Sequence, residues 1–174
     1  MLTIRKASEA EFSAVRAFYH NTIELMQNAP HHPGWQKGVY PSDAALRAHL
    51  RTGELYIGLA QDEIAAAMVL NHACSERYAD AHWPTQASPD EVFVLHLLGV
   101  LPTHARRGYA KRMVQFAIDL ARQGGGKCLR LDVLHGNLPA LRLYEGLGFR
   151  YVETLPLFYE DTGWTDFLLY EYAL

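Results

Sequence analysis

Three residues of the C-terminal half, Asn137, Ala140 and Tyr144, have types and a spacing that suit chemistry. They are three and four residues apart, so on a helix they share one face. That face would present an amide, a small gap and a phenol to a neighbouring molecule. The same residues also have ordinary structural uses, because asparagine is a common helix N-cap and a helical tyrosine is often a core aromatic. The spacing marks a candidate site and leaves its chemistry open.

A second candidate feature lies upstream, where the apolar residues 94–101 run into residues 103–110. The pattern predicts a strand, a turn and the start of a helix. The first N–H groups of a helix lack intrahelical partners and carry partial positive charge, so such a junction suits a phosphate. Gly108 and Ala110 leave the backbone open to close approach. Three basic residues could add contacts to an anion or simply be solvated: Arg106, Arg107 and Lys111.

Together, these two stretches resemble the core motifs of the GNAT superfamily of N-acetyltransferases. The first is similar to the family's Q/R-x-x-G-x-G/A loop, with Gly108 and Ala110 at its last two defined positions. The second is similar to its N-x-x-A-x-x-x-Y-x-x-x-G-F segment, and five residues match: Asn137, Ala140, Tyr144, Gly148 and Phe149. The Gln or Arg of the first motif is Ala105 here, so phosphate contacts would rest on backbone amides and on neighbouring Arg106.

The resemblance implies that the chain binds acetyl-CoA. By the family pattern, pantetheine pairs like an extra strand with the backbone around Leu98 and Val100, and the pyrophosphate lies on the amides of residues 106–111. An amine attacks the thioester, a backbone N–H of the same strand holds the oxyanion, and Tyr144 protonates the leaving thiolate as general acid. The expected acetyl-CoA contacts are Leu98, Gly99, Val100, Arg106, Arg107, Gly108, Tyr109, Ala110, Lys111, Asn137, Ala140, Arg142 and Tyr144.

The base that takes a proton from the acceptor remains open between two residues, Glu91 and His96. Glu91 starts the predicted strand, and His96 interrupts its apolar run with an imidazole whose unperturbed pKa of about 6.5 suits a base. Each also has a structural explanation: Glu91 as a solvated strand end, and His96 as a hydrogen-bonded core residue, which we favour slightly. No metal is expected, because the adjacent pair His31 and His32 has no third ligand.

The acceptor site is expected in two irregular, aromatic-rich segments, residues 28–41 and 74–89, and near the C-terminus. Aromatic side chains there could form pocket walls for an amine or anchor the loops to the sheet. The candidates are Trp35, Tyr40, Tyr78, Trp83 and Tyr159. The favoured acceptor is a small primary amine, such as an amino acid, a polyamine or an aminoglycoside-like compound. The alternatives are a protein N-terminus or lysine, and a catalytically silent CoA-binding regulatory module.

The elements that must position these residues follow from hydrophobic spacing. Alternating or apolar runs predict strands at residues 2–6, 55–60, 64–71, 91–101, 128–134, 149–153 and 166–172. Helical spacing predicts helices from a Ser8–Glu11 capping box to about Met26, from Ser42 to about Gly53, and over 108–122 and 137–147. This order predicts an α+β class, a mostly antiparallel sheet of about seven strands flanked by about four helices, as in the GNAT acyl-CoA N-acyltransferase fold. With neither a repeat nor a linker, residues 1–174 form one predicted domain.

Composition places few further limits. Of 174 residues, 49% are hydrophobic and 20% charged, which is ordinary for a globular domain. A net charge of −3 gives no electrostatic reason to bind nucleic acid or an anionic membrane. Without a signal-peptide pattern or a membrane-length apolar run, the expected location is cytoplasmic. Cys74 and Cys128 are expected to be buried and reduced. The expected partners are acetyl-CoA and an amine acceptor, and a homodimer is left open.

Overall fold

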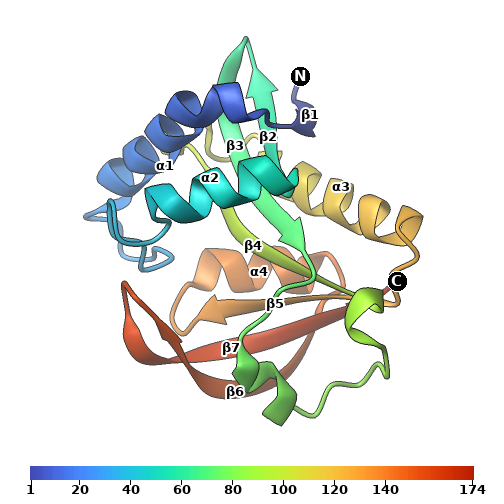
Figure 1. Ribbon diagram of the computed structural model, residues 1–174. Coiled ribbons are helices and arrows are strands. Elements are labelled where there is room, and N and C mark those ends of the chain that lie inside the picture. Colours follow the sequence, from blue (N-terminus) through green and yellow to red (C-terminus); the bar gives the residue numbers. More distant parts are fainter.

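The computed structural model describes all residues 1–174 and shows one seven-stranded sheet with helices packed on it (Figure 1). The strands are β1 (Thr3–Lys6), β2 (Leu55–Ala60), β3 (Glu63–Asn71), β4 (Val92–Val100), β5 (Cys128–Leu134), β6 (Arg150–Tyr159) and β7 (Gly163–Ala173). The helices are α1 (Phe12–Met26), α2 (Asp43–Thr52), α3 (Tyr109–Gln123) and α4 (Leu138–Gly146). The predicted fold class and the predicted order of elements are confirmed.

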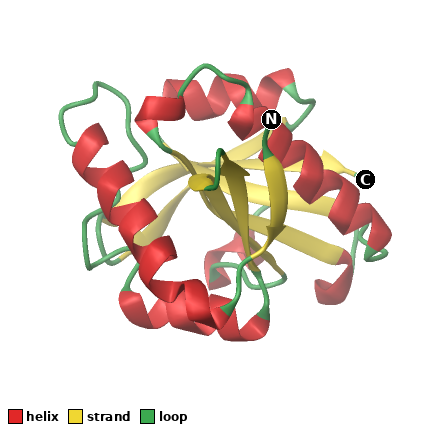
Figure 2. Ribbon diagram, turned by 90° about the horizontal axis from the view of Figure 1, so that it is seen from above, coloured by secondary structure: helices red, strands yellow, loops and turns green.

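The strands lie in the order β1-β2-β3-β4-β5-β7-β6, and every neighbouring pair is antiparallel except β4 and β5. Helices cover both faces of this sheet (Figure 2). In β3, Met68 belongs to the core shared with α3 and α4, whereas Val69 belongs to the core shared with α1 and α2. Burial on both faces explains why β3 reads as a continuous apolar run.

Local signals set most helix ends where the sequence predicts them. The Ser8–Glu11 capping box forms and precedes α1. The hydroxyl of Ser42 accepts a hydrogen bond from the Ala45 N–H and caps α2, which ends at Gly53 in the left-handed conformation. The ends of α3 and β4 differ from prediction by a residue, as expected of fraying element ends.

The two closing strands are longer than predicted. The sequence predicts strands at 149–153 and 166–172, whereas β6 and β7 continue to a tight turn at residues 160–162. Pro156 and the consecutive apolar residues Leu157 and Phe158 after it break the alternating pattern. β6 is the edge strand and has a neighbouring strand on one side only. An edge strand can accept a proline, which has no N–H to donate. The prediction that both cysteines are buried is wrong for Cys74, which is exposed in the connection after β3.

The parallel strands β4 and β5 are paired only along their first halves. The ladder joins residues 92–94 to residues 128–130 and then stops. The second halves of the two strands diverge, so each presents an unpaired edge to the space between them. This wedge is the only place where the sheet opens between two interior strands, and it is where a ligand could reach the middle of the sheet.

A bulge in β4 lies beside this opening. Val69 of β3 is opposite His96, whereas Ala67 is opposite Gly99, so β4 has one residue more than its partner over this stretch. Leu97, inside the bulge, has a φ of +53°, a conformation that bulky residues rarely adopt. Bulges redirect side chains, and here the residues on either side of the irregularity face the wedge.

Candidate active site

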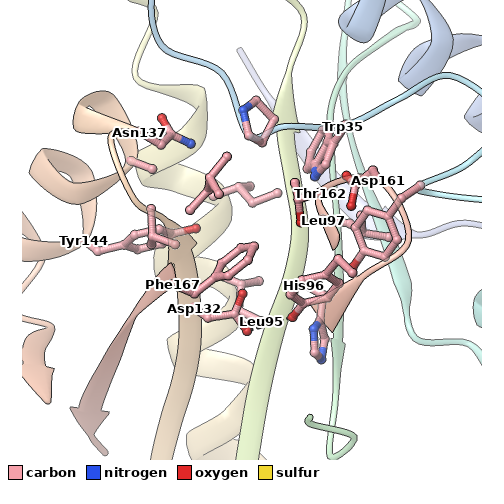
Figure 3. Close-up of a pocket in the computed structure, with 17 residues that line it drawn as sticks. Trp35, Leu95, His96, Leu97, Asp132, Asn137, Tyr144, Asp161, Thr162 and Phe167 are labelled. Atoms are coloured by element: carbon pink, nitrogen blue, oxygen red, sulfur yellow. Dashed lines mark hydrogen bonds between the residues drawn. The ribbon is translucent and has the colours of Figure 1, made fainter. Parts of the chain in front are cut away.

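A pocket occupies the wedge between β4 and β5 (Figure 3). Its empty volume is about 660 Å³, part of it open to solvent. Tyr144 and Asn137 lie on one side, Trp35 and Asp161 on the other, and Asp132 lies between them (Figure 3). The full lining is Pro33, Trp35, Tyr40, Leu95, His96, Leu97, Leu98, Asp132, Val133, Leu134, Asn137, Ala140, Tyr144, Tyr159, Asp161, Thr162 and Phe167.

The helix face predicted from the spacing of Asn137, Ala140 and Tyr144 lines one wall of this pocket. Asn137 precedes α4, but its side chain makes no capping hydrogen bond and is free for a ligand. The Tyr144 ring is buried edge-on against Phe149, and its hydroxyl has no hydrogen-bond partner in the chain. Burial, with a smaller contribution from the Asp132 charge, raises the pKa of Tyr144, so the phenol keeps its proton.

The loop before α3 presents a row of free backbone donors. No backbone carbonyl accepts a hydrogen bond from the N–H groups of residues 106–111. Arg106 (φ +62°) and Gly108 (φ +75°) both adopt the left-handed conformation, which turns successive amides toward one side. Such an arrangement at a helix N-terminus suits a pyrophosphate. Ala105, at the departure from the family motif, is exposed and adds no side-chain donor.

Four of the predicted cofactor contacts are exposed cations that take part in no ion pair: Arg106, Arg107, Lys111 and Arg142. The side chain of Tyr109 instead points into the core beside His104, so only its backbone faces the loop. On β4, Leu98 lines the pocket, and Val100 lies further along the strand. Gly99 packs against Trp35, where an added Cβ would lie 3.2 Å from the ring.

His96 lines the pocket as a neutral, hydrogen-bonded residue. Its Nε2 lies 3.0 Å from Asn71 Oδ1 and 2.9 Å from the carbonyl oxygen of Ala73. The orientation of the Asn71 amide is set by the Ala73 N–H, which donates to Oδ1, and by Glu54, which accepts from Nδ2. We therefore assign the proton of the imidazole to Nε2. Burial lowers the pKa of His96 below its usual value, which favours the neutral ring.

Three of the residues predicted for catalysis or acceptor binding lie outside the pocket lining. Glu91 accepts hydrogen bonds from Ser88 and pairs with Lys127 at 2.9 Å, which places its carboxylate at the start of β4, away from the wedge. Tyr78 is buried behind the pocket. Trp83 packs on Tyr78 and on the Arg130 guanidinium, 4.2 Å from its ring centroid, and so anchors its loop to the sheet. Of the five predicted acceptor aromatics, only Trp35, Tyr40 and Tyr159 line the pocket.

Asp132 of β5 is a pocket residue that the sequence did not single out. Its Oδ2 accepts hydrogen bonds from the hydroxyls of Tyr78 (2.7 Å) and Tyr159 (2.9 Å), whereas its Oδ1 has no partner in the chain. Burial raises the pKa of the Asp132 carboxyl, and the two phenols offset only part of that rise. One signal was available in the sequence: a lone carboxylate in the apolar strand 128–134 calls for an explanation.

Asp161 and Thr162 are further pocket residues that the sequence did not single out, since they lie in the β6–β7 turn.

No group of three or more His, Cys, Asp or Glu side chains is arranged to hold a metal ion. No helix is long and apolar enough to cross a membrane.

Residues 20–149 match the model of the acetyltransferase (GNAT) family. The uncharacterized N-acetyltransferase YhfO of Bacillus subtilis (strain 168) is 27% identical over 172 residues, covering 97% of both chains. A GNAT-family acetyltransferase from Streptococcus agalactiae 2603 superposes with a TM-score of 0.81 at 17% identity, covering 99% of this chain and 95% of the other. YncA of Salmonella typhimurium, a protein solved with its cofactor acetyl-CoA, superposes with a TM-score of 0.70 at 18% identity, covering 100% and 94%.

The chain therefore belongs to the GNAT family and is an acetyl-CoA-dependent N-acetyltransferase. The resemblance inferred from the two motifs is confirmed, and with it the predicted fold. A catalytically silent CoA-binding module, the alternative from a different class, is not supported.

Proposed function

We propose that this acetyltransferase transfers the acetyl group to a primary amine of a small molecule, with Tyr144 as the general acid. The observation that carries the proposal is one pocket that contains both the Tyr144 phenol and an aromatic-lined space for an acceptor. Tyr144 lines the wall formed by α4, and Trp35, Tyr40 and Tyr159 line the opposite side.

Features around the wedge fit acetyl-CoA. The unpaired half of β4 around Leu98 offers a strand edge to the pantetheine amides, and the free N–H groups of residues 106–111 offer donors to the pyrophosphate. The exposed cations Arg106, Arg107 and Lys111 belong to the same segment as these amides. They compensate for the Gln or Arg side chain of the family motif, which Ala105 lacks. The acetyl thioester would then lie beside Tyr144, within the pocket.

Acetyl-CoA supplies an activated acetyl group to this site. As the acceptor nitrogen forms its bond to the acetyl carbon and the carbon–sulfur bond breaks, Tyr144 donates its phenolic proton to the sulfur. It regains a proton from the acceptor nitrogen. The raised pKa of Tyr144 keeps the phenol protonated before the reaction, so a proton is in place when the sulfur leaves.

Contacts between two segments at the acceptor side favour a small molecule over a peptide. The loop between α1 and α2 meets the β6–β7 turn: the side-chain amide of Gln36 donates to the carbonyl oxygen of Asp161 at 2.6 Å. The rings of Tyr40 and Tyr159 meet edge-on, 5.3 Å apart. Because these two segments are in contact beside the pocket, they narrow the space in which an extended peptide could lie.

A thiol-release assay tests the proposal. Purified protein is mixed with acetyl-CoA and, in separate reactions, small primary amines, peptides with free N-termini and lysine-containing peptides. We expect CoA release above the acceptor-free rate with small amines, and an N-acetylated product by mass spectrometry. Turnover confined to peptides would overturn the small-molecule proposal.

Substitution of Gly108 by alanine tests the phosphate-binding loop. A residue with a Cβ is strained at φ +75° by about 1–2 kcal/mol, and relief of that strain moves the adjacent amides. We expect the Kd for CoA, measured by calorimetry, to rise about tenfold. Gly125→Ala is the matched control, since Gly125 has φ +78°, equally open surroundings and a place at the other end of α3. Equal losses of CoA affinity in both variants would contradict the assignment.

A further inference from the structure

The pocket lining has an uneven charge. It contains two carboxylates, Asp132 and Asp161, and neither a lysine nor an arginine. Its one histidine, His96, is held neutral by burial and donates to two oxygen acceptors. An acceptor that enters this space therefore meets a negative field with no internal counter-charge.

Asp132 carries the first unsatisfied carboxylate oxygen. The hydroxyls of Tyr78 and Tyr159 both donate to Oδ2, which fixes the carboxylate and leaves Oδ1 without a partner in the chain. The negative charge of Asp132 also contributes to the raised pKa of Tyr144, so the carboxylate lies close to the proposed acid. An ammonium bound at Oδ1 would lie beside the residue that protonates the leaving sulfur.

Asp161 carries the second unsatisfied carboxylate oxygen. Its Oδ1 is buried and has no hydrogen-bond partner. A carboxylate with a buried, unpartnered oxygen is poorly stabilised, and a cation bound in the pocket that Asp161 lines would lower the cost of its charge. The position of Asp161 is fixed through its backbone, because Gln36 donates to its carbonyl oxygen. The carboxylate is thus held at the end of the pocket that lies across from Tyr144 (Figure 3).

Aromatic rings surround the space near these carboxylates. Trp35, Tyr40, Tyr159 and Phe167 line the pocket, and the first is itself fixed by edge-on packing against Tyr19. Ring faces attract cations, and they also bury the methylene chain between two cationic groups. Carboxylates combined with aromatic walls are the chemistry that recognises aliphatic ammonium groups.

We propose that the acceptor is a small aliphatic amine that carries a second cationic group and no carboxylate. The Asp132 carboxylate binds the ammonium that reacts and takes its proton, and the Asp161 carboxylate pairs with the second cation. This inference rests on the proposed function and narrows its substrate class to diamines and related dications. The proposal excludes free amino acids, because the carboxylates of Asp132 and Asp161 would repel the carboxylate of the amino acid.

The protons balance with these roles. The acceptor ammonium loses one proton to Asp132, which releases it to water, and the resulting amine forms the nitrogen–carbon bond. The nitrogen loses a second proton as the amide forms. That proton returns to Tyr144, which has given its own to the sulfur as the carbon–sulfur bond breaks. One acetyl transfer thus yields an amide, a free CoA thiol and one proton in solution.

Three four-carbon acceptors test the proposal in the thiol-release assay: 1,4-diaminobutane, butylamine and 4-aminobutanoate. We expect kcat/KM for the diamine to exceed that for butylamine about tenfold or more, because a charge-assisted contact is gained. We expect 4-aminobutanoate to be slower than the diamine by about 100-fold or more, because like charges repel. Diamines of three to six carbons, assayed alongside, identify the best separation of the two cations.

The Asp161→Asn variant tests whether Asp161 causes the preference for the diamine over butylamine. We expect it to reduce the preference for the diamine over butylamine to about twofold or less. Asp166→Asn is the matched control: Asp166 is an exposed carboxylate of β7 outside the pocket, and its loss changes the net charge equally. We expect that variant to keep the preference.

The outcomes separate the two proposals. If CoA binds but none of the amines is acetylated, the proposed function fails. If amines are acetylated but 4-aminobutanoate equals or exceeds the diamine, or if the preference survives Asp161→Asn, the dication inference fails while the proposed function stands.

Discussion

Tyr144→Phe is expected to lower kcat by about 10²- to 10⁴-fold, the usual contribution of a positioned general acid. The substitution removes only a hydroxyl that has no hydrogen-bond partner in the chain, and it keeps the ring that packs against Phe149. The Kd for acetyl-CoA should therefore change by less than about twofold, and the melting temperature should be preserved. Steady-state kinetics with the best amine, together with calorimetry, separates the loss of turnover from a loss of binding.

Tyr56→Phe is the matched control for this prediction. Tyr56 of β2 is also buried, its hydroxyl likewise makes no hydrogen bond, and it packs against Phe116, away from the pocket. We expect this variant to keep the wild-type kcat. A Tyr144→Phe enzyme that turns over within about twofold of the wild type would remove Tyr144 from the mechanism.

Asp132→Asn is expected to lower kcat/KM by about 10²- to 10⁴-fold through loss of the proton acceptor. The asparagine oxygen still accepts hydrogen bonds from Tyr78 and Tyr159, so the site keeps its shape. The pH profile gives a second measurement. Because burial raises the pKa of Asp132, wild-type activity should fall in acid at a higher pH than an ordinary aspartate would allow.

The groups that face Asp132 decide how that profile is interpreted. They are His96 from β4, Tyr144 from α4, Tyr159 from β6, and Tyr40, Cys74, Tyr78 and Asp161 from the connecting segments. The pKa values of the tyrosines are all raised, so they stay protonated in acid. His96 gains charge in acid at a pH below its ordinary pKa. In Asp132→Asn, the acid limb caused by Asp132 should disappear. A limb that persists unchanged would assign it to His96 or to Asp161, whose pKa is also raised by burial.

Stability should move in the opposite direction to activity. A carboxyl whose pKa is higher in the folded state than in the unfolded state destabilises the fold at neutral pH, and the penalty disappears as the pH falls through both pKa values. Asp132→Asn should therefore be at least as stable as the wild type at pH 7, with the difference shrinking in acid. A marked loss of melting temperature at pH 7 would indicate that Asp132 is mainly structural.

The sequence by itself determined what local geometry controls. Asn137, Ala140 and Tyr144 share a face because of their spacing on one helix, as predicted, and in the structure that face lines the pocket. Capping residues and apolar runs located nearly all helices and strands. The exceptions are β6 and β7, which support each other as a long hairpin across a stretch where neither has a clear pattern of its own.

Only the tertiary structure decided which polar residues meet in the pocket. The environment of Asp132 depends on Tyr78 and Tyr159, which approach from a loop and from β6, and such distant contacts leave no trace in spacing. The same holds for Glu91, whose carboxylate pairs with Lys127 outside the wedge. The aromatic candidates were divided in the same way: Trp83 anchors a loop, whereas Trp35 lines the site.

The physical reason is the range of the interactions involved. Helix periodicity and capping act over a few residues, so the helix face and the loop that we assign to acetyl-CoA were legible in the sequence. The proposed acceptor side is built from a loop, a strand end and a hairpin turn that meet only after the sheet has formed. Its charge, set by Asp132 and Asp161, is therefore a property of the fold.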